Sequence, residues 1–156
     1  MPTLTHEPPA AGALPGSVRL LLSPRVPLVK MDTVIAACGE IADIIHGHVE
    51  KGRLRWVFNV ATNPSGIRDL RFWNREVSAF SSSQRSELAA LREATVQSVV
   101  DRILGVTPRL TSGQVCLLLG IRRPTLMDLR QELQGDGREF FPRRGLERFL
   151  KRRLLR

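Results

Sequence analysis

The stretch EKGRLRWVFNVATNPSGIRDLRFWNREVSAF, residues 50–80, decides the fold that the sequence predicts. Polar and apolar residues alternate in RLRWVFNV (53–60) and again in DLRFW (69–73), which is the period of a strand with one packed face. The segment between them, ATNPSGIR, is rich in turn-forming residues. We therefore predict a β-hairpin followed by a short helix at 75–80. The outer face of the hairpin would carry Arg53, Arg55, Arg71 and Trp73, with Trp56 in the core.

Two short helices are predicted immediately before this hairpin. Gly39 separates MDTVIAAC (31–38) from EIADIIHGHVEK (40–51), and Gly52 is a suitable stop. The isoleucines and valine of the second helix recur at helical spacing, so we predict that they face the core. These residues are Ile41, Ile44, Ile45 and Val49. The opposite face of that helix carries Glu40, Asp43, His46, Gly47 and Glu50.

A second pair of helices is predicted in the C-terminal half. Thr111 and Gln114 have the spacing of a capping box at the start of SGQVCLLL. Gly120 provides a turn, and Pro124 suits the first turn of the next helix, RRPTLMDLRQEL (122–133). A basic helix, GLERFLKRRLLR, ends the sequence. Between the two halves, the spacing of Leu, Val and Ile in 86–104 predicts one amphipathic helix of about five turns.

The order helix, glycine turn, helix, hairpin and short helix occurs twice, with a shorter hairpin in the second copy. We therefore predict a mainly α fold with a short β-hairpin wing, built from two tandem units. Residues 1–17, rich in Pro, Gly and Ala, are predicted to be a disordered arm. The predicted division is an arm at 1–17, a first unit at 18–80, a connecting helix and loop at 81–109, and a second unit with a basic C-terminal helix at 110–156.

The chain has 24 basic and 15 acidic residues, a net charge of +9 and an isoelectric point near 11.3. This charge favours a polyanionic partner, nucleic acid first and an anionic membrane second. Residues 1–80 hold 9 basic and 7 acidic side chains, whereas residues 81–156 hold 15 and 8, so this hypothesis falls mainly on the second half. Arginine far outnumbers lysine; it is the better fork for phosphate and guanine, although a GC-rich genome would explain that ratio equally well.

Several function classes are not expected. Cys38 and Cys116 lie far apart in apolar helical patterns, which is typical of reduced, buried thiols in a cytosolic protein. His46 and His48 point apart on a helix and make no metal set with them. The sequence contains no phosphate-binding loop, nucleophile elbow, secretion signal or membrane-spanning apolar run. We expect a cytoplasmic, nucleoid-associated protein that is not an enzyme and has no cofactor, metal, membrane or small-molecule substrate.

Two stretches resemble a known family. TSGQVCLLLGIRRPTLMDL (111–129) resembles the helix-turn-helix of excisionase and MerR-type regulators, with its capped helix, its LLG and its RRPT opening the recognition helix. VEKGRLRWVFNV and RDLRFWNREVSAF (49–80) resemble the helix end, two-stranded wing and closing helix of the same module. The resemblance implies a winged helix-turn-helix fold and binding of double-stranded DNA. The role would be that of a transcriptional regulator or an excisionase-like recombination directionality factor.

In such a module the second helix lies in the major groove, where its outward side chains read base edges. In this chain the outward residues are Arg122, Arg123, Thr125, Asp128 and Gln131. The hairpin, the helix end and the basic C-terminal helix would contact the DNA backbone. Those residues are Arg53, Arg55, Arg68, Arg71, Arg130, Arg143, Arg144, Arg148, Lys151, Arg152 and Arg153. Because phosphates would repel the carboxylates of helix 40–51, we expect that helix not to enter the groove, and the hairpin to clamp the backbone.

Alternatives remain open at this point. The charged helix faces could simply be solvated, and the amphipathic helices could bind another protein, which would make the chain a non-enzymatic adaptor. Trp73 could stack under Arg53 or Arg55, or anchor an interface. Helix 86–104 could pair two chains in a homodimer or cover the two units of one chain.

Overall fold

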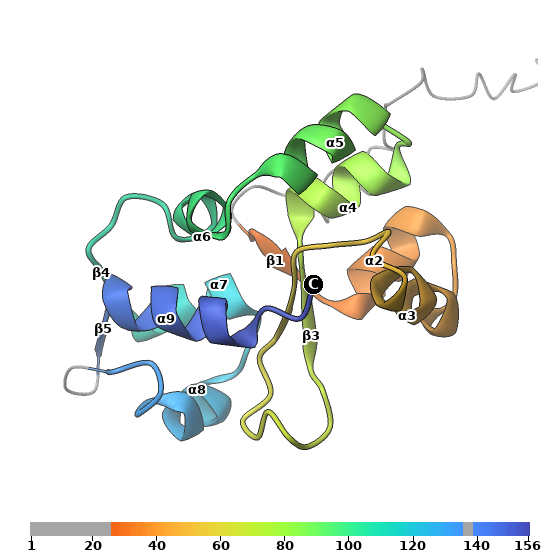
Figure 1. Ribbon diagram of the computed structural model, residues 1–156. Helices are drawn as coiled ribbons and strands as arrows, with labels where there is room; N and C mark the ends of the chain where they lie inside the picture. The colour runs from red at the N-terminus through yellow and green to blue at the C-terminus, as the bar shows by residue number, and fades with distance from the viewer. Residues whose placement is uncertain (1–25, 136–138) are drawn as a thin grey trace, which may run out of the picture.

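The computed structural model describes residues 26–135 and 139–156, so the predicted arm lies outside the described residues. The described part is mainly helical with two small antiparallel sheets, which confirms the predicted fold class at this level (Figure 1). No described helix is long and apolar enough to cross a membrane. The first unit comprises β1 (Leu28–Val29), α2 (Met31–Cys38), α3 (Ala42–Glu50), β2 (Val57–Asn59), β3 (Leu70–Trp73) and α4 (Asn74–Ser81). After α5 (Arg85–Glu93) and α6 (Val96–Leu104), the second unit comprises β4 (Arg109–Thr111), α7 (Ser112–Leu119), α8 (Arg123–Leu129), β5 (Phe140–Pro142) and α9 (Arg143–Arg153).

The two units share an order of elements, except that the described part of the second has no counterpart of β2. The shorter hairpin predicted for the second unit is therefore absent from the described residues, where β5 pairs with β4 instead. β1, α2 and α3 recur as β4, α7 and α8 with an offset of 81 residues: Lys30 and Thr111 precede the first helix, and Gly39 and Gly120 end it. β1 pairs Val29 with Phe72 of β3, and β4 pairs Leu110 with Phe141 of β5. The offset falls to 69 residues from Phe72 to Phe141, because the first unit has β2 and its leading segment between α3 and β3, whereas the described residues between α8 and β5 hold no strand.

Local signals set both ends of α7 and the start of α8 as predicted. The Thr111 hydroxyl accepts a hydrogen bond from the Gln114 amide at 3.2 Å, and the Gln114 side chain accepts one from the Thr111 amide at 2.9 Å. Gly120 ends α7 in the left-handed region, with φ of 63°. Pro124 lies in the first turn of α8. These contacts involve near neighbours in the chain, so they can be predicted from the local sequence alone.

Two predicted helices are shorter than expected. The predicted helix 86–104 is two helices, α5 and α6, because Thr95 caps α6 by accepting a hydrogen bond from the Ser98 amide at 3.1 Å. The predicted helix 122–133 ends at Leu129. The chain then turns, and the carbonyl of Leu133 lies so close to Gly145 of α9 that a Cβ there would be only 2.1 Å from its oxygen. Gln131 therefore lies in a turn instead of on the recognition-helix face.

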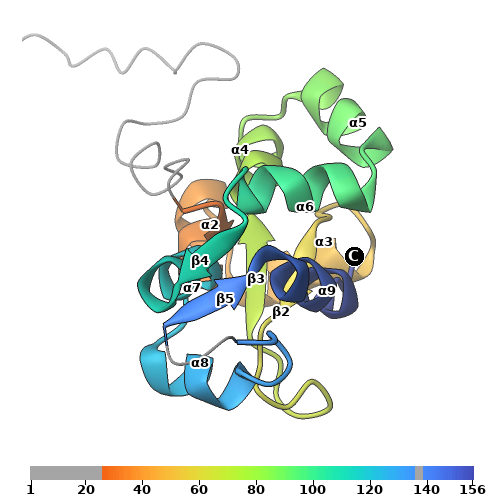
Figure 2. The same cartoon turned by 90° about the vertical axis from the view of Figure 1, so that its left-hand side faces the viewer.

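The β2–β3 hairpin is buried on both faces, whereas the sequence predicted one exposed face. β3 lies between β1 and β2, and the end of the chain pairs with the other edge of β2, where the Leu155 amide donates to the Val57 carbonyl at 2.8 Å. The helices of the second unit cover the face that was predicted to carry arginine (Figure 2). The strands of the hairpin are therefore part of the core, and only its loop is exposed.

The main hydrophobic core is shared by both units. Trp56 and Trp73 of the first unit pack edge to face at 6.4 Å and belong to the same cluster as Leu126 and Phe149 of the second. The Trp56 indole donates to the Leu91 carbonyl at 2.9 Å. Trp73 is thus an internal anchor, and the cation over its ring belongs to Arg75, at 5.8 Å, instead of Arg53 or Arg55. Residues of α5, α6 and the second unit complete this core, so the two units are packed against each other.

Glu76 in the first turn of α4 is a fully buried carboxylate. One of its oxygens accepts a hydrogen bond from the Arg55 amide at 2.6 Å, and the other has no hydrogen-bond partner among the described residues. Burial raises the pKa of Glu76, although the Arg55 amide and the charges of Arg92 and Arg55 oppose this shift. The ionised form is therefore less favourable in the folded state than in the unfolded state.

We predict that Glu76→Gln raises the free energy of unfolding at neutral pH and that this gain shrinks toward acid pH. As pH rises above the ordinary pKa of 4.5, the unfolded carboxyl loses its proton before the folded one, so wild-type stability falls through this window. The amide cannot ionise and removes that fall. Urea unfolding followed by tryptophan fluorescence, from about pH 4 to about pH 8, measures the difference in free energy of unfolding between the variant and the wild type across this titration. The control is Glu87→Gln, a surface partner of Arg75; equal behaviour of the two variants would contradict the prediction.

Candidate nucleic-acid interface

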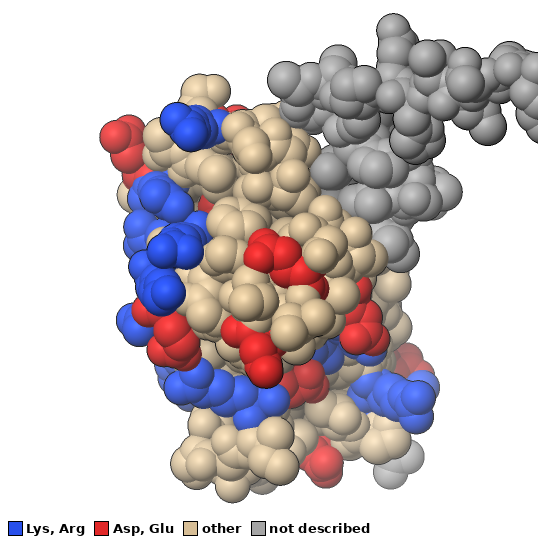
Figure 3. Space-filling model, turned by 90° about the vertical axis from the view of Figure 1, so that its right-hand side faces the viewer, with Lys and Arg blue, Asp and Glu red and all other residues tan. Residues whose placement is uncertain are grey.

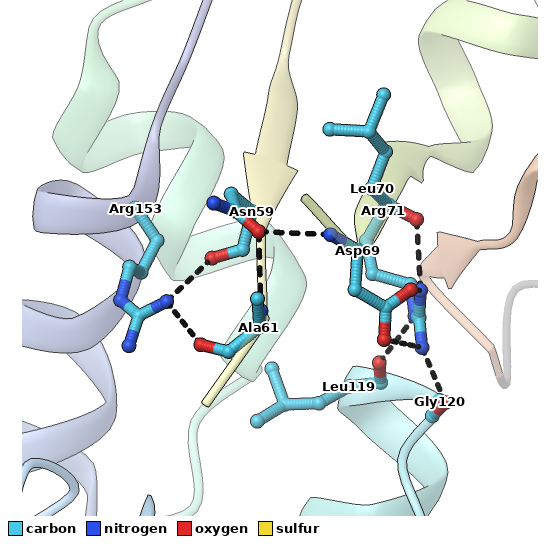
Figure 4. A network of polar contacts seen from close by, with 8 residues as sticks. All are labelled: Asn59, Ala61, Asp69, Leu70, Arg71, Leu119, Gly120 and Arg153. Carbon is cyan, nitrogen blue, oxygen red and sulfur yellow. Dashed lines mark hydrogen bonds and ion pairs between the residues drawn. The ribbon is translucent and has the colours of Figure 1, made fainter. Parts of the chain in front are cut away.

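The turn between α7 and α8 is held by a buried arginine of the first unit. The Arg71 guanidinium, from β3, donates to the carbonyls of Leu119 and Gly120 at 2.8 Å each (Figure 4). It also donates to the Leu70 carbonyl at 2.8 Å and pairs with the Asp69 carboxylate. The carbonyls at the end of α7 carry partial negative charge, so a cation is favourable there. A Cβ at Gly120 would lie 3.0 Å from Arg71 Nε, which is a tight contact, and the positive φ of this turn also favours glycine.

A second buried arginine ties α9 to the end of β2. Arg153 donates to the carbonyls of Asn59 and Ala61 (Figure 4). Its guanidinium also pairs with Glu132 at 2.7 Å. Arg71 and Arg153 were both predicted to contact DNA phosphates. That prediction is wrong for these two residues, because each is at most 4% exposed and has its donors engaged inside the protein. Both side chains form hydrogen bonds between the two units, and the sequence pattern did not indicate these contacts.

The start of α8 presents two arginines to solvent. Arg122 precedes the helix and Arg123 opens it; both are exposed, and neither guanidinium has a hydrogen bond or ion pair with any residue that the structure describes. Asp128 is exposed on the same helix, whereas Thr125 is partly buried. The structure therefore brings Arg122, Arg123 and Asp128 together on one exposed element. Unpaired guanidinium groups beside the positive end of a helix form an anion-attracting surface.

Other predicted backbone residues lie on a basic strip along one face. Arg148, Lys151 and Arg152 are exposed on α9, and Arg156 follows. The Arg156 carbonyl accepts a hydrogen bond from the Trp56 amide at 2.7 Å, which places it beside the segment that contains Arg53. Figure 3 shows lysine and arginine gathered along this edge of the molecule. We define the basic strip as the exposed residues Arg53, Arg92, Arg148, Lys151, Arg152 and Arg156.

Arg92 is a member of the strip that the sequence did not predict. It belongs to α5, and its guanidinium donates to the Arg53 carbonyl at 2.9 Å. Arg92 lies in a segment that the sequence predicted only as a connecting helix, and nothing in that segment indicates that it would lie beside the hairpin. The fold brings these two arginines together from positions 39 residues apart.

The remaining predicted backbone contacts differ in how available they are. Arg68 and Arg144 are exposed, the former on the hairpin loop with a 3.5 Å contact to Glu50. Arg143 is engaged inside the protein, with ion pairs to Asp101 at 2.7 Å and Glu147 at 2.8 Å. Two more, Arg55 and Arg130, are partly buried. Of these side chains, Arg68 and Arg144 are the ones most free to reach a phosphate.

The face of α3 is unlike that of α8, although the two helices hold equivalent places. Ile41 and Ile44 are 66% and 46% exposed, which corrects the prediction that they face the core; only Ile45 and Val49 of that predicted stripe are buried. With the 81-residue offset, Ile41 takes the place of Arg122 and Ile44 that of Thr125. Asp32 of α2 and Asp43 and Glu50 of α3 are exposed. Figure 3 shows separate acidic groups on the apolar and neutral surface of this side of the molecule. The chemistry of the α3 face does not suit contact with phosphate.

The cysteines and His48 are packed against neighbouring residues of the fold. Cys38 and Cys116 are free thiols and partly buried, and burial with the charge of Glu40 raises the pKa of Cys38 to about 11. His48 contacts Glu40 at 3.1 Å and packs edge-on against Phe80. Within residues 26–135 and 139–156, no group of His, Cys, Asp and Glu has the arrangement of a metal site.

Comparison of the chain with protein-family models, with curated proteins and with solved structures finds no significant match. What the chain does must therefore be inferred from its own residues and their geometry.

We predict that Arg71→Met lowers the free energy of unfolding by about 2–5 kcal/mol, because three carbonyls lose their buried donor. Urea unfolding monitored by the fluorescence of Trp56 and Trp73 measures this loss. The control is Arg68→Met, which removes an exposed pair worth at most about 1 kcal/mol. If both variants lost equally little, Arg71 would not be the link between the units.

Proposed function

We propose that this protein binds double-stranded DNA sequence-specifically through two winged helix-turn-helix units, of which the second reads bases. The observation that supports this most is the pair Arg122 and Arg123, unpaired and exposed at the start of the second helix of a glycine-turned helix pair. Arg71 holds that turn rigidly from the neighbouring unit. A rigid support is what a base-reading helix requires, since hydrogen bonds to base edges depend on exact placement.

In this proposal the start of α8 enters the major groove. A guanidinium group can donate two hydrogen bonds to the O6 and N7 atoms of guanine, and a carboxylate such as that of Asp128 can accept one from the cytosine amino group. The basic strip and Arg144 contact phosphates, which supplies affinity without sequence preference. A transcriptional regulator and an excisionase-like recombination directionality factor both begin with this binding step.

The two surfaces lie on neighbouring elements. α8 lies below α9, which carries half of the strip, in Figure 1. A circular-permutation mobility shift on a selected site would measure whether the duplex bends on binding, and a bend would favour the recombination directionality factor over a simple regulator.

We predict that Arg123→Ala lowers discrimination at one base position by about 1–3 kcal/mol, because one bidentate contact to guanine is lost. Sites are first selected from random duplexes with the wild-type chain, and affinities are then measured for each single-base change. Arg85→Ala is the matched control, since Arg85 is an exposed arginine on α5, away from α8. Equal weakening at every base position would contradict the assignment of Arg123 to base reading.

We predict that Arg148→Ala combined with Arg152→Ala weakens binding to all sequences alike. Each lost phosphate contact should reduce the slope of log affinity against log salt by about 0.9. Mobility shifts on a random duplex across a range of salt concentrations measure this slope, with Arg85→Ala as the control. An unchanged slope would remove the strip from the interface. If folded wild-type chain failed to bind any duplex at low salt, the adaptor function would be favoured instead.

A further inference from the structure

α3 presents an aliphatic ridge that the proposed DNA contact does not use. Ile41 and Ile44 are the exposed residues of this ridge, and Glu40 and Asp43 flank it. In the second unit the equivalent positions hold Arg122 and Thr125. The same backbone frame thus displays an apolar and acidic surface in one unit and a basic surface in the other. Exposed aliphatic side chains grouped on one helix are typical of a protein interface.

A groove with the opposite character lies between α6, β4 and α7. Its volume is about 320 Å³, and its walls include Ile103, Leu104, Leu110, Leu117 and Leu118. Leu117 is 57% exposed at its rim. Arg102 is the one charged side chain among the described residues that line the groove. The groove therefore suits an aliphatic group that arrives beside a carboxylate.

The ridge and the groove lie at opposite ends of the molecule. In Figure 1, α3 is on the right, whereas α6 and β4 are on the left. One copy therefore cannot place its own ridge in its own groove. A contact between two unlike surfaces joins copies head to tail. Pairing of one ridge with another ridge would instead bring Asp43 and Glu40 against their own counterparts, which is unfavourable.

We infer that the Ile41–Ile44 ridge of one copy docks into the α6–β4–α7 groove of a second copy, with Asp43 and Glu40 directed toward Arg102. Burial of the isoleucines in the leucine-lined groove supplies the affinity, and the single arginine sets the orientation. This contact does not depend on the DNA-binding proposal, because it uses neither Arg122, Arg123 nor the basic strip.

The test is sedimentation velocity of the full chain without DNA, over a range of concentrations. The wild type should associate as concentration rises. Ile44→Asp and Leu117→Asp should each raise the dissociation constant about tenfold or more, because a charge then replaces a buried aliphatic group. Ile67→Asp is the matched control, since Ile67 is a 95% exposed isoleucine on the hairpin loop, and it should associate as the wild type does.

Mixing the two defective variants distinguishes this contact from others. Leu117→Asp chains keep an intact ridge and Ile44→Asp chains keep an intact groove, so an equimolar mixture should form heterodimers that do not grow further. Asp43→Arg should weaken association, and Arg102→Asp in the same chain should restore it. Far-ultraviolet circular dichroism checks that every variant is folded.

Three outcomes would overturn the inference: a wild type that stays monomeric at all concentrations, an Ile44→Asp chain that associates normally, or a mixture that does not associate. Loss of association in Leu117→Asp alone would show that something other than the ridge of a second copy occupies the groove.

Discussion

The guanidinium of Arg71 links the two units of this protein at the point on which the rest of the arrangement depends. It comes from the central strand of the first unit and donates to the last carbonyls of α7 in the second. A buried cation is tolerated only where its donors are matched, so the position of the α7–α8 turn is fixed relative to β3. Arg153 makes the reverse connection, from α9 of the second unit to the end of β2. Together they leave the hairpin strands no exposed face.

This link gives the repeated units different tasks. The first unit uses its β3 side chain to support the turn of the second, while the second closes the sheet of the first with the end of the chain. The equivalent helices α3 and α8 then differ in what they display. One displays isoleucine and carboxylates, and the other displays two exposed arginines without ion-pair partners among the described residues. A single frame thus offers one surface that suits a protein and one that suits a polyanion.

Much of the local structure could be predicted from the sequence. The capping box at Thr111, the left-handed glycines at 39 and 120, and Pro124 at the start of α8 all depend on residues within a turn or two of each other. The alternation in 53–60 and 69–73 located β2 and β3, and the predicted pairs of short helices on either side of Gly39 and Gly120 are present. The arginines at the start of α8 were also identified correctly as exposed, because the spacing of Leu126, Leu129 and Leu133 placed the apolar face of this segment on the other side.

The rest was decided by contacts between distant segments. Period-2 alternation says which side chains share a face of a strand, but not whether a second layer will cover the other face. Arg71 and Arg153 were therefore predicted to be surface cations, although packing between the two units buries them. Helical spacing likewise predicted that Ile41 and Ile44 are buried together with Ile45 and Val49. In the structure only Ile45 and Val49 pack against neighbouring elements. Local order came from near neighbours in the chain, whereas burial and the availability of each charge came from packing that no short segment encodes.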